Sequence, residues 1–305
     1  MRRLILSCLA LLAGAMLVRA QAPPAEPEGV VAKRVMMIAP APIFERVARA
    51  ESVVTGKVTS IEEKSLMAPS IFGAKDNVEY LIAVVKIDEA IQGAKGLTHI
   101  KVGFLAPQAA GGGRPLRPGG IGRGQAKLEK DQEVLLFLNP HHTGEFQIME
   151  AYFDVVDKKA DTYDKDLEAA KKYAKILADP VTGLQSKDAT ERITAAAMLI
   201  SKYRTPRPST KEPKEEPIEA GLSKLILNTL ADADWTPAKP GGPIGNNQLM
   251  PLNLFFRLNL TDKDGWKPPM DGNKFAEAAQ QWMKDNKDKY VLKRFVTEKD
   301  DKKDK

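Results

Sequence analysis

The stretch EFQIMEAYFDVVDKKADTYDKDLEAAKKYAKILADP, residues 145–180, contains the position at which the spacing of apolar residues changes. Before Asp157, apolar and polar residues alternate, as they do in a half-buried strand. After Asp157, the apolar residues recur every three or four positions, as in an amphipathic helix, at Leu167, Ala170, Ala174 and Leu177. We therefore expect an α+β protein, with strands before residue 157 and helices after it.

Five segments upstream of this point predict strands. They are residues 51–63, 80–93, 98–105, 132–140 and 145–157. Residues 80–85 are apolar on both faces, which is typical of a central strand covered on both sides. The strands therefore predict a β domain over residues 41–157.

Five segments downstream predict helices. They are residues 164–180, 186–206, 218–230, 247–260 and 273–286. Asp188, with Glu191 three residues later, resembles a capping box at the start of the second helix. Large aromatic side chains usually anchor packing, so we expect a helical domain over residues 158–296 with three tryptophans in its core, Trp235, Trp266 and Trp282.

The first twenty residues have the layout of a secretory signal peptide. Arg2 and Arg3 precede an apolar run that is shorter than the roughly 20 residues of a membrane span. Val18 and Ala20 are the β-branched and small residues that a signal peptidase site requires, with cleavage expected after Ala20. An uncleaved membrane anchor is the alternative. Export predicts a secreted, periplasmic or cell-envelope protein whose mature chain has no transmembrane segment. Residues 21–40 and 297–305 have the composition of a disordered spacer and a disordered charged tail.

The only cysteine, Cys8, lies inside the signal peptide. The mature chain therefore has no disulfide framework, thiolate nucleophile or cysteine-based zinc site. Removing Arg2, Arg3 and Arg19 lowers the formal charge from +6 to +3. Because lysines alternate with acids, we interpret most of the charge as solvated surface, and we do not expect nucleic acid as a partner.

The run AAGGGRPLRPGGIGRGQ, residues 109–125, concentrates glycine, proline and arginine. It lacks both the phosphate-loop and the dinucleotide-binding patterns, and residues 105–136 contain no tryptophan or tyrosine beside these arginines. We expect a flexible connection between two strands. The alternative is a loop that contacts a polyanion through Arg114, Arg117 and Arg123.

The three histidines, His99, His141 and His142, are the candidate metal ligands. Adjacent residues of an extended chain point apart, so we expect His141 and His142 to lie in a solvated turn rather than to share an ion. The acids Asp154 and Asp157 are interpreted as surface residues. Because no catalytic motif is visible, we predict no cofactor, no metal site and no enzymatic activity.

Three segments follow one another in the order SVVTGKVTSIE, VVKIDEAIQG and LEKDQEVLLFL. In this order they resemble the netrin-module and metalloproteinase-inhibitor-like β-barrels of secreted proteins. The resemblance covers residues 45–155 and implies a five-stranded OB-like barrel. Inhibitors of that family chelate zinc through an N-terminal cysteine amine and rely on disulfides. Since the mature chain has no cysteine, the resemblance extends to the fold and not to that mechanism.

The segment LQSKDATERITAAAMLISKY, residues 184–203, resembles a HEAT-type helix, in which an arginine of the first turn precedes a stripe of small residues. Together the two resemblances predict an OB-like barrel followed by an all-α domain. We expect an exported, non-catalytic binding or scaffold protein with a protein or glycan partner. The alternative is an inhibitor or regulator of a secreted hydrolase that acts through the barrel loops.

Overall fold

The computed structural model describes residues 40–70, 72–105, 126–151, 153–206, 213–236 and 248–296. The chain divides into two compact units, Met1–Met37 and Ile38–Lys305, and every described residue lies in the second unit. The expected signal peptide, all but the last residue of the spacer and the charged tail lie outside the described residues.

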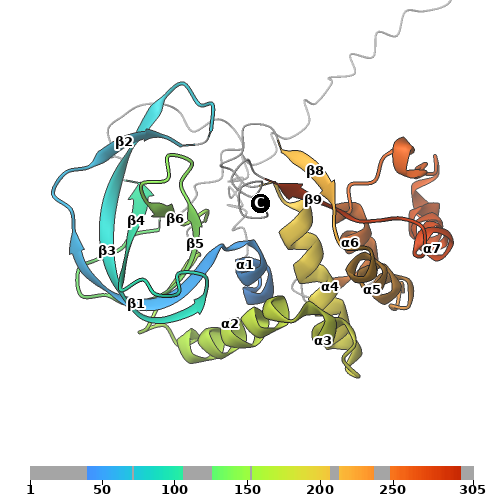
Figure 1. Ribbon diagram of the computed structural model, residues 1–305, viewed down its shortest axis with the longest axis horizontal. Coiled ribbons are helices and arrows are strands. Elements are labelled where there is room, and N and C mark those ends of the chain that lie inside the picture. Colours follow the sequence, from blue (N-terminus) through green and yellow to red (C-terminus); the bar gives the residue numbers. More distant parts are fainter. Residues whose placement is uncertain are drawn as a thin grey trace, which may run out of the picture. The chain divides into compact units, whose positions relative to one another are not determined.

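The second unit combines a seven-stranded sheet with several helices, so the α+β class is confirmed (Figure 1). The strands of this sheet are β1 (Ser52–Ile61), β2 (Leu66–Pro69), β3 (Asn77–Gln92), β4 (His99–Leu105), β5 (Glu133–Pro140), β6 (Gln147–Ile148) and β7 (Val155–Asp157). Four of the five expected strands correspond to β1, β3, β4 and β5. The fifth expected strand is divided into β6 and β7, and β2 was not expected.

Strand β1 pairs with β3 along one edge and with β5 along the other, antiparallel in both cases. Strand β4 is antiparallel to β3 and parallel to β6, and β6 is antiparallel to β5. Strand β2 pairs with β3, and strand β7 pairs with β5. The expected central position of β3 is therefore confirmed.

The two faces of β3 pack against different clusters. Ala83 and Val85 belong to a core that also contains Val54, Val102 and Leu136 from the neighbouring strands. Tyr80 and Ile82 alternate with them and form a smaller cluster on the opposite face, together with Ala68 and Phe146. This division explains why residues 80–85 are apolar at every position.

The helices are α1 (Ile43–Arg49), α2 (Tyr163–Ala178), α3 (Pro180–Leu184), α4 (Ala189–Arg204), α5 (Ala220–Ala231), α6 (Pro251–Arg257) and α7 (Phe275–Asn286). All five expected helices are confirmed as α2, α4, α5, α6 and α7, with shorter bounds in most cases. Asp188 caps α4 by accepting a hydrogen bond from the Thr190 amide at 2.8 Å. Glu191 accepts from the Ser186 hydroxyl, so it does not close the expected capping box.

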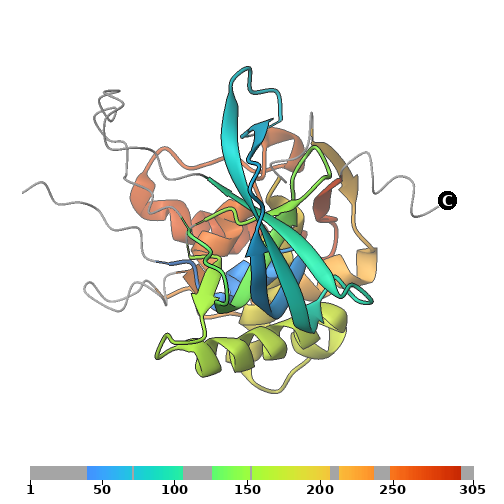
Figure 2. The ribbon, with the colours of Figure 1, turned by 90° about the vertical axis from the view of Figure 1, so that its left-hand side faces the viewer.

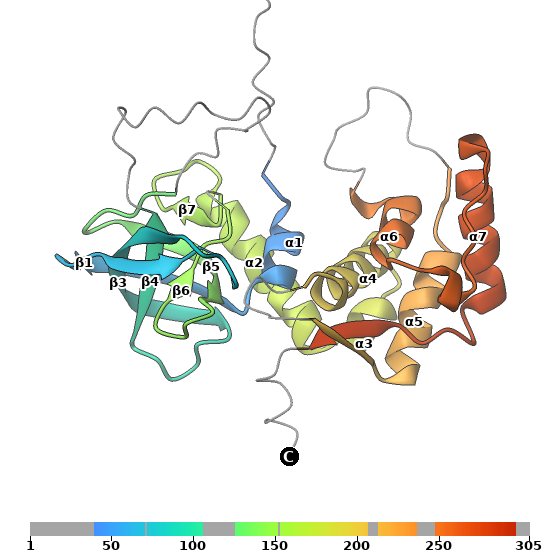
Figure 3. The same cartoon turned by 90° about the horizontal axis from the view of Figure 1, so that it is seen from above.

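The prediction of strand structure from residue 41 onward is wrong for residues 43–49, which form α1. Phe44, Val47 and Ala48 are buried on one side of this helix, which packs against α2 and α4 (Figure 3). A helix of seven residues shows fewer than two turns of apolar spacing, so its sequence does not distinguish it from a short strand.

The prediction of an all-α region after residue 157 is also wrong at one place. Strand β8 (Lys214–Pro217) pairs with β9 (Lys293–Val296), so this small sheet joins segments that are far apart in sequence. The buried guanidinium of Arg204 lies 4.8 Å from the Phe295 ring and donates to Glu215 at 2.8 Å. These contacts hold the small sheet against α4.

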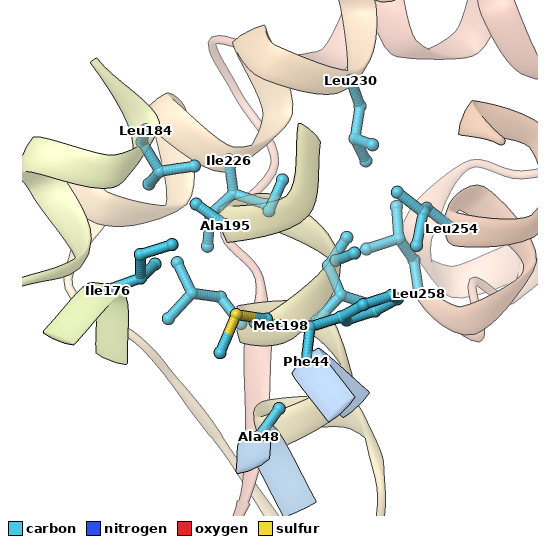
Figure 4. Packing of buried hydrophobic residues seen from close by; sticks show 14 of the residues in the cluster. Phe44, Ala48, Ile176, Leu184, Ala195, Met198, Ile226, Leu230, Leu254 and Leu258 are labelled. Atoms are coloured by element: carbon cyan, nitrogen blue, oxygen red, sulfur yellow. The ribbon is translucent and has the colours of Figure 1, made fainter. Parts of the chain in front are cut away.

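The largest core joins the helices to one end of the main sheet. It contains Val53 and Phe137 from the strands, as well as buried residues from every helix from α1 to α7. Figure 4 shows Phe44 and Ala48 of α1 beside Met198 of α4. The three tryptophans are less than 10% exposed, which confirms that they are core residues.

Candidate binding surface

The residues that the sequence suggested as sites come from three segments of the chain. Arg114, Arg117 and Arg123 lie in the segment 106–125, outside the described residues. His99 is the first residue of β4, whereas His141 and His142 follow the last residue of β5.

The three histidines do not converge on one site. His99 lies opposite Lys86 on β3, whereas the His141 ring contacts Tyr80, six residues earlier on the same strand. Six residues of a strand span about 20 Å. Within the described ranges, no group of three or more histidine, cysteine or acidic side chains is placed to hold a metal ion.

His141 is buried, with 1% of its surface exposed, so the prediction of a solvated turn is wrong for this residue. Its Nε2 atom donates to the Pro69 carbonyl at 3.1 Å, and its Nδ1 atom lies 2.9 Å from the Thr143 hydroxyl. The Thr143 amide also points to Nδ1, at 3.4 Å, which assigns the proton to Nε2. Burial, together with His142, lowers the pKa of His141, so the imidazole is neutral.

Three aromatic rings contact His141, and a fourth, Phe72, contacts one of these three. The His141 imidazole stacks on Phe146, with ring centroids 4.4 Å apart and planes inclined by 13°. Tyr80 and His142 lie at 5.4 and 4.0 Å, and His142 lies 6.0 Å from Phe72. We call these five residues the aromatic tip.

The two adjacent histidine rings lie side by side, contrary to the expectation that they point apart. Strand β5 ends at Pro140, and a tight turn begins at once, because the Gly144 amide donates to the His141 carbonyl at 2.8 Å. Gly144 has φ = 78°, a left-handed conformation that glycine adopts without strain. The alternation of an extended chain therefore does not apply to this dipeptide.

The aromatic tip has a buried base and an exposed edge. Tyr80, His141 and Phe146 are at most 5% exposed, whereas 42% of the Phe72 surface is exposed and His142 is half-buried. Phe72 follows β2 in the β2–β3 connection, which extends beyond the neighbouring strands (Figure 2). The arrangement presents a flat apolar ring and an imidazole on a packed support.

Two further apolar side chains are exposed near this end of the sheet. Leu105, 38% exposed, lies opposite Tyr80 at the end of β4, and Met67, 58% exposed, lies on β2. The segment that carries the three arginines begins directly after Leu105. The apolar run 80–85 identified the strand that carries Tyr80, but no local pattern indicated that Phe72 and His142 would meet.

A second cluster, made of buried polar residues, lies between α1 and β5. Arg46 is buried, its guanidinium lies 4.5 Å from the Phe137 ring centroid, and its Nη1 atom donates to the Phe153 carbonyl. Asp154 is only 8% exposed and accepts a hydrogen bond from the Ala151 amide at 2.8 Å. The interpretation of Asp154 as a surface residue is therefore wrong.

Burial dominates the electrostatics of this second cluster. It raises the pKa of Asp154 to about 6 and lowers the pKa of Arg46, although each group favours the charged form of the other. Within the described segments no direct ion pair joins the two side chains. The adjoining cavity is about 50 Å³, much smaller than a pocket for a metabolite, so we assign the cluster to the attachment of α1.

No family model matches this chain, and no curated protein matches it. In the described part of the chain, no helix has both the length and the apolar character needed to cross a membrane. At the aromatic tip, the surface offers ring stacking, apolar contact and hydrogen bonds to an imidazole.

Proposed function

We propose that this protein is an exported, non-catalytic binding or scaffold protein of the cell envelope or extracellular space, and that it binds its partner through the aromatic tip. The observation that carries the proposal is the exposed Phe72 beside the half-buried His142, above a buried base of three rings. A partner that covers rigid aromatic rings gains apolar contact at a small cost in side-chain entropy.

The strand pairings support an OB-like barrel as the scaffold of this surface. Five strands, β1, β3, β4, β6 and β5, each pair with two others of the set, and the last pairs again with the first. OB barrels bind ligands on the face of their second and third strands and with the adjacent loops. In this chain those strands correspond to β3 and β4. Tyr80 lies on β3, opposite Leu105 at the end of β4. The netrin-type resemblance of residues 45–155 is part of the same proposal.

The partner that we propose is a protein or a glycan, because both are recognised by exposed aromatic rings beside hydrogen-bonding groups. The alternative function, inhibition or regulation of a secreted hydrolase, is favoured by one observation. Phe72 lies on a connection that extends beyond the neighbouring strands, and such a connection can enter a concave active site (Figure 2).

The test compares matched variants of the chain from Gln21 to Lys305. The immobilised chain is exposed to a solubilised envelope fraction and to insoluble polysaccharides of the same source, and the dissociation constant of the purified partner is then measured. Phe72→Ser is expected to weaken binding at least about tenfold, since exposed aromatic residues dominate such contacts. Val181→Ser is the control, because Val181 is also 42% exposed but lies on α3.

Equal dissociation constants for the wild-type chain, Phe72→Ser and His142→Ser would show that the aromatic tip is not the binding surface. The alternative function has its own measurement. If the partner is a hydrolase, its activity should fall on addition of one equivalent of the wild-type chain and should remain with Phe72→Ser. Activity that is unchanged by the wild-type chain supports the scaffold function instead.

A further inference from the structure

A groove of about 540 Å³ lies among the helices, away from the aromatic tip. Its walls come from the first turn of α4, the second half of α5 and the start of α6. The floor is apolar and includes Leu184, Ile193, Leu225 and Leu249. This volume falls within the range of known ligand sites.

One stripe of α5 determines what the groove can recognise. Leu225, Asn228, Thr229 and Asp232 all line it, at the spacing that places residues on one helix face. From Leu225 to Asp232 the helix rises about 10 Å, the length of about three residues of extended peptide. The groove therefore matches a short extended segment in length.

Asn228 supplies the polar group that favours a peptide. The Thr229 hydroxyl donates to the Leu225 carbonyl at 2.9 Å and is satisfied within the helix. In contrast, the half-buried side-chain amide of Asn228 has no hydrogen-bond partner among the described residues. A carboxamide both donates and accepts, so it complements the N–H and C=O groups of a peptide backbone.

The charges of the groove favour a basic residue at one end. Asp232 and Asp234 are exposed where α5 ends, and the helix dipole adds negative potential at the same place. Bonds from the Thr236 hydroxyl and amide lower the pKa of Asp234, which keeps it ionised. Arg192 is the one cation among the described lining residues, and its Nη1 atom already donates to the carbonyls of Ser186 and Lys187.

We propose that this groove binds an extended peptide segment of a partner protein, with apolar side chains on Leu184, Ile193 and Leu225 and a lysine or arginine beside Asp232 and Asp234. The backbone of the segment pairs with the Asn228 amide. This site is independent of the aromatic tip, so the two proposals succeed or fail separately.

The experiment uses the ¹⁵N-labelled chain from Gln21 to Lys305 and two fluorescein-labelled peptides. One contains two leucines followed by two lysines between glycines, and the other has glutamates in place of the lysines. The basic peptide should shift the side-chain amide resonances of Asn228 and saturate. Fluorescence anisotropy should give at least about threefold weaker binding of the acidic peptide, the change expected for exposed ion pairs.

Two variants assign the binding to the named groups. Asn228→Ala should weaken both peptides, because it removes the backbone contacts. The double variant Asp232→Asn with Asp234→Asn should weaken only the basic peptide, by about threefold to tenfold. The matched control is Glu277→Gln with Asp285→Asn, which changes the same number of exposed acids on α7.

The proposal would be overturned by equal binding of the two peptides, by saturating shifts confined to residues outside the groove, or by full affinity in Asn228→Ala. The absence of saturation with either peptide at millimolar concentration would also overturn it. Thermal unfolding of each variant, followed by circular dichroism, ensures that a lost signal reflects the groove and not an unfolded chain.

Discussion

The ring of Phe146 lies directly on the backbone of Gly103. A Cβ atom at position 103 would stand 2.3 Å from Phe146 Cε2, a separation that side-chain carbons do not adopt. Gly103 belongs to β4 and pairs with Ile148 of β6, so the ring covers the sheet face between these strands. His141 stacks on this ring, and the aromatic tip therefore depends on the absence of a side chain in β4.

Gly103→Ala should displace Phe146 and lower the free energy of unfolding by about 1–3 kcal/mol, as overpacking does in other cores. The measurement is urea denaturation followed by tryptophan fluorescence. Gly272→Ala serves as the control, because a Cβ atom at that position meets no atom within 4 Å. Equal stability of the two variants would contradict the contact.

His141 should make the protein sensitive to mild acid. Its pKa in the folded state is lowered, and the pKa of an unfolded histidine is about 6.5. The stability contributed by the neutral imidazole is therefore present above about pH 6.5 and is lost as the pH falls toward the lower folded value. Between pH 7 and pH 5, the wild-type chain should lose more stability than His141→Gln. Parallel stability curves over this interval would show that His141 is not the responsible group.

Asp154 should give the opposite pH dependence of the free energy of unfolding. Its folded pKa of about 6 lies above the unfolded value of about 3.9, so its contribution is most favourable at low pH and is lost as the pH rises through 6. Asp154→Asn keeps an acceptor for the Ala151 amide without a buried charge. This variant should gain up to roughly 3 kcal/mol over the wild-type chain at pH 8 and only about 0.5 kcal/mol at pH 4. Denaturation at the two pH values checks the sign.

The alanines of α4 should be intolerant of larger side chains. Ala195, Ala196 and Ala197 have no exposed surface and belong to the core, so their small side chains allow neighbouring elements to pack close to the helix. Ala196→Leu should lower the free energy of unfolding by about 1–3 kcal/mol. Ala189→Leu, at the exposed first position of the same helix, should change it by less than about 0.5 kcal/mol. Thermal and chemical denaturation of both variants provide the comparison.

The long elements could be predicted, whereas several short ones could not. Strand β3 and helices α2 and α4 have 16 residues each, enough to show several repeats of their apolar spacing. Helix α1 has seven residues and β6 has two, so neither shows a repeat that differs from chance. The same limit explains why β8 and β9, of four residues each, were not expected.

The candidate site was predicted only in part. His141 and His142 were identified by residue type, but their burial and mutual contact depend on Pro69, which is 72 residues from His141. The approach of Phe72 to His142 likewise depends on the β2–β3 connection. Such contacts arise from strand pairing across the sheet and leave no periodic signal in either segment.

The sequence by itself determined the class of the protein, the order of the strands β1, β3, β4 and β5 and of the helices α2, α4, α5, α6 and α7, and the tryptophan core, because the spacing of apolar side chains records which face of each element is buried. The tertiary structure decided which polar groups leave water. His141 and Asp154 look like surface residues in the chain and are buried in the fold, since burial depends on what distant segments place over a residue. The aromatic tip and the groove between α4 and α5 are products of that assembly.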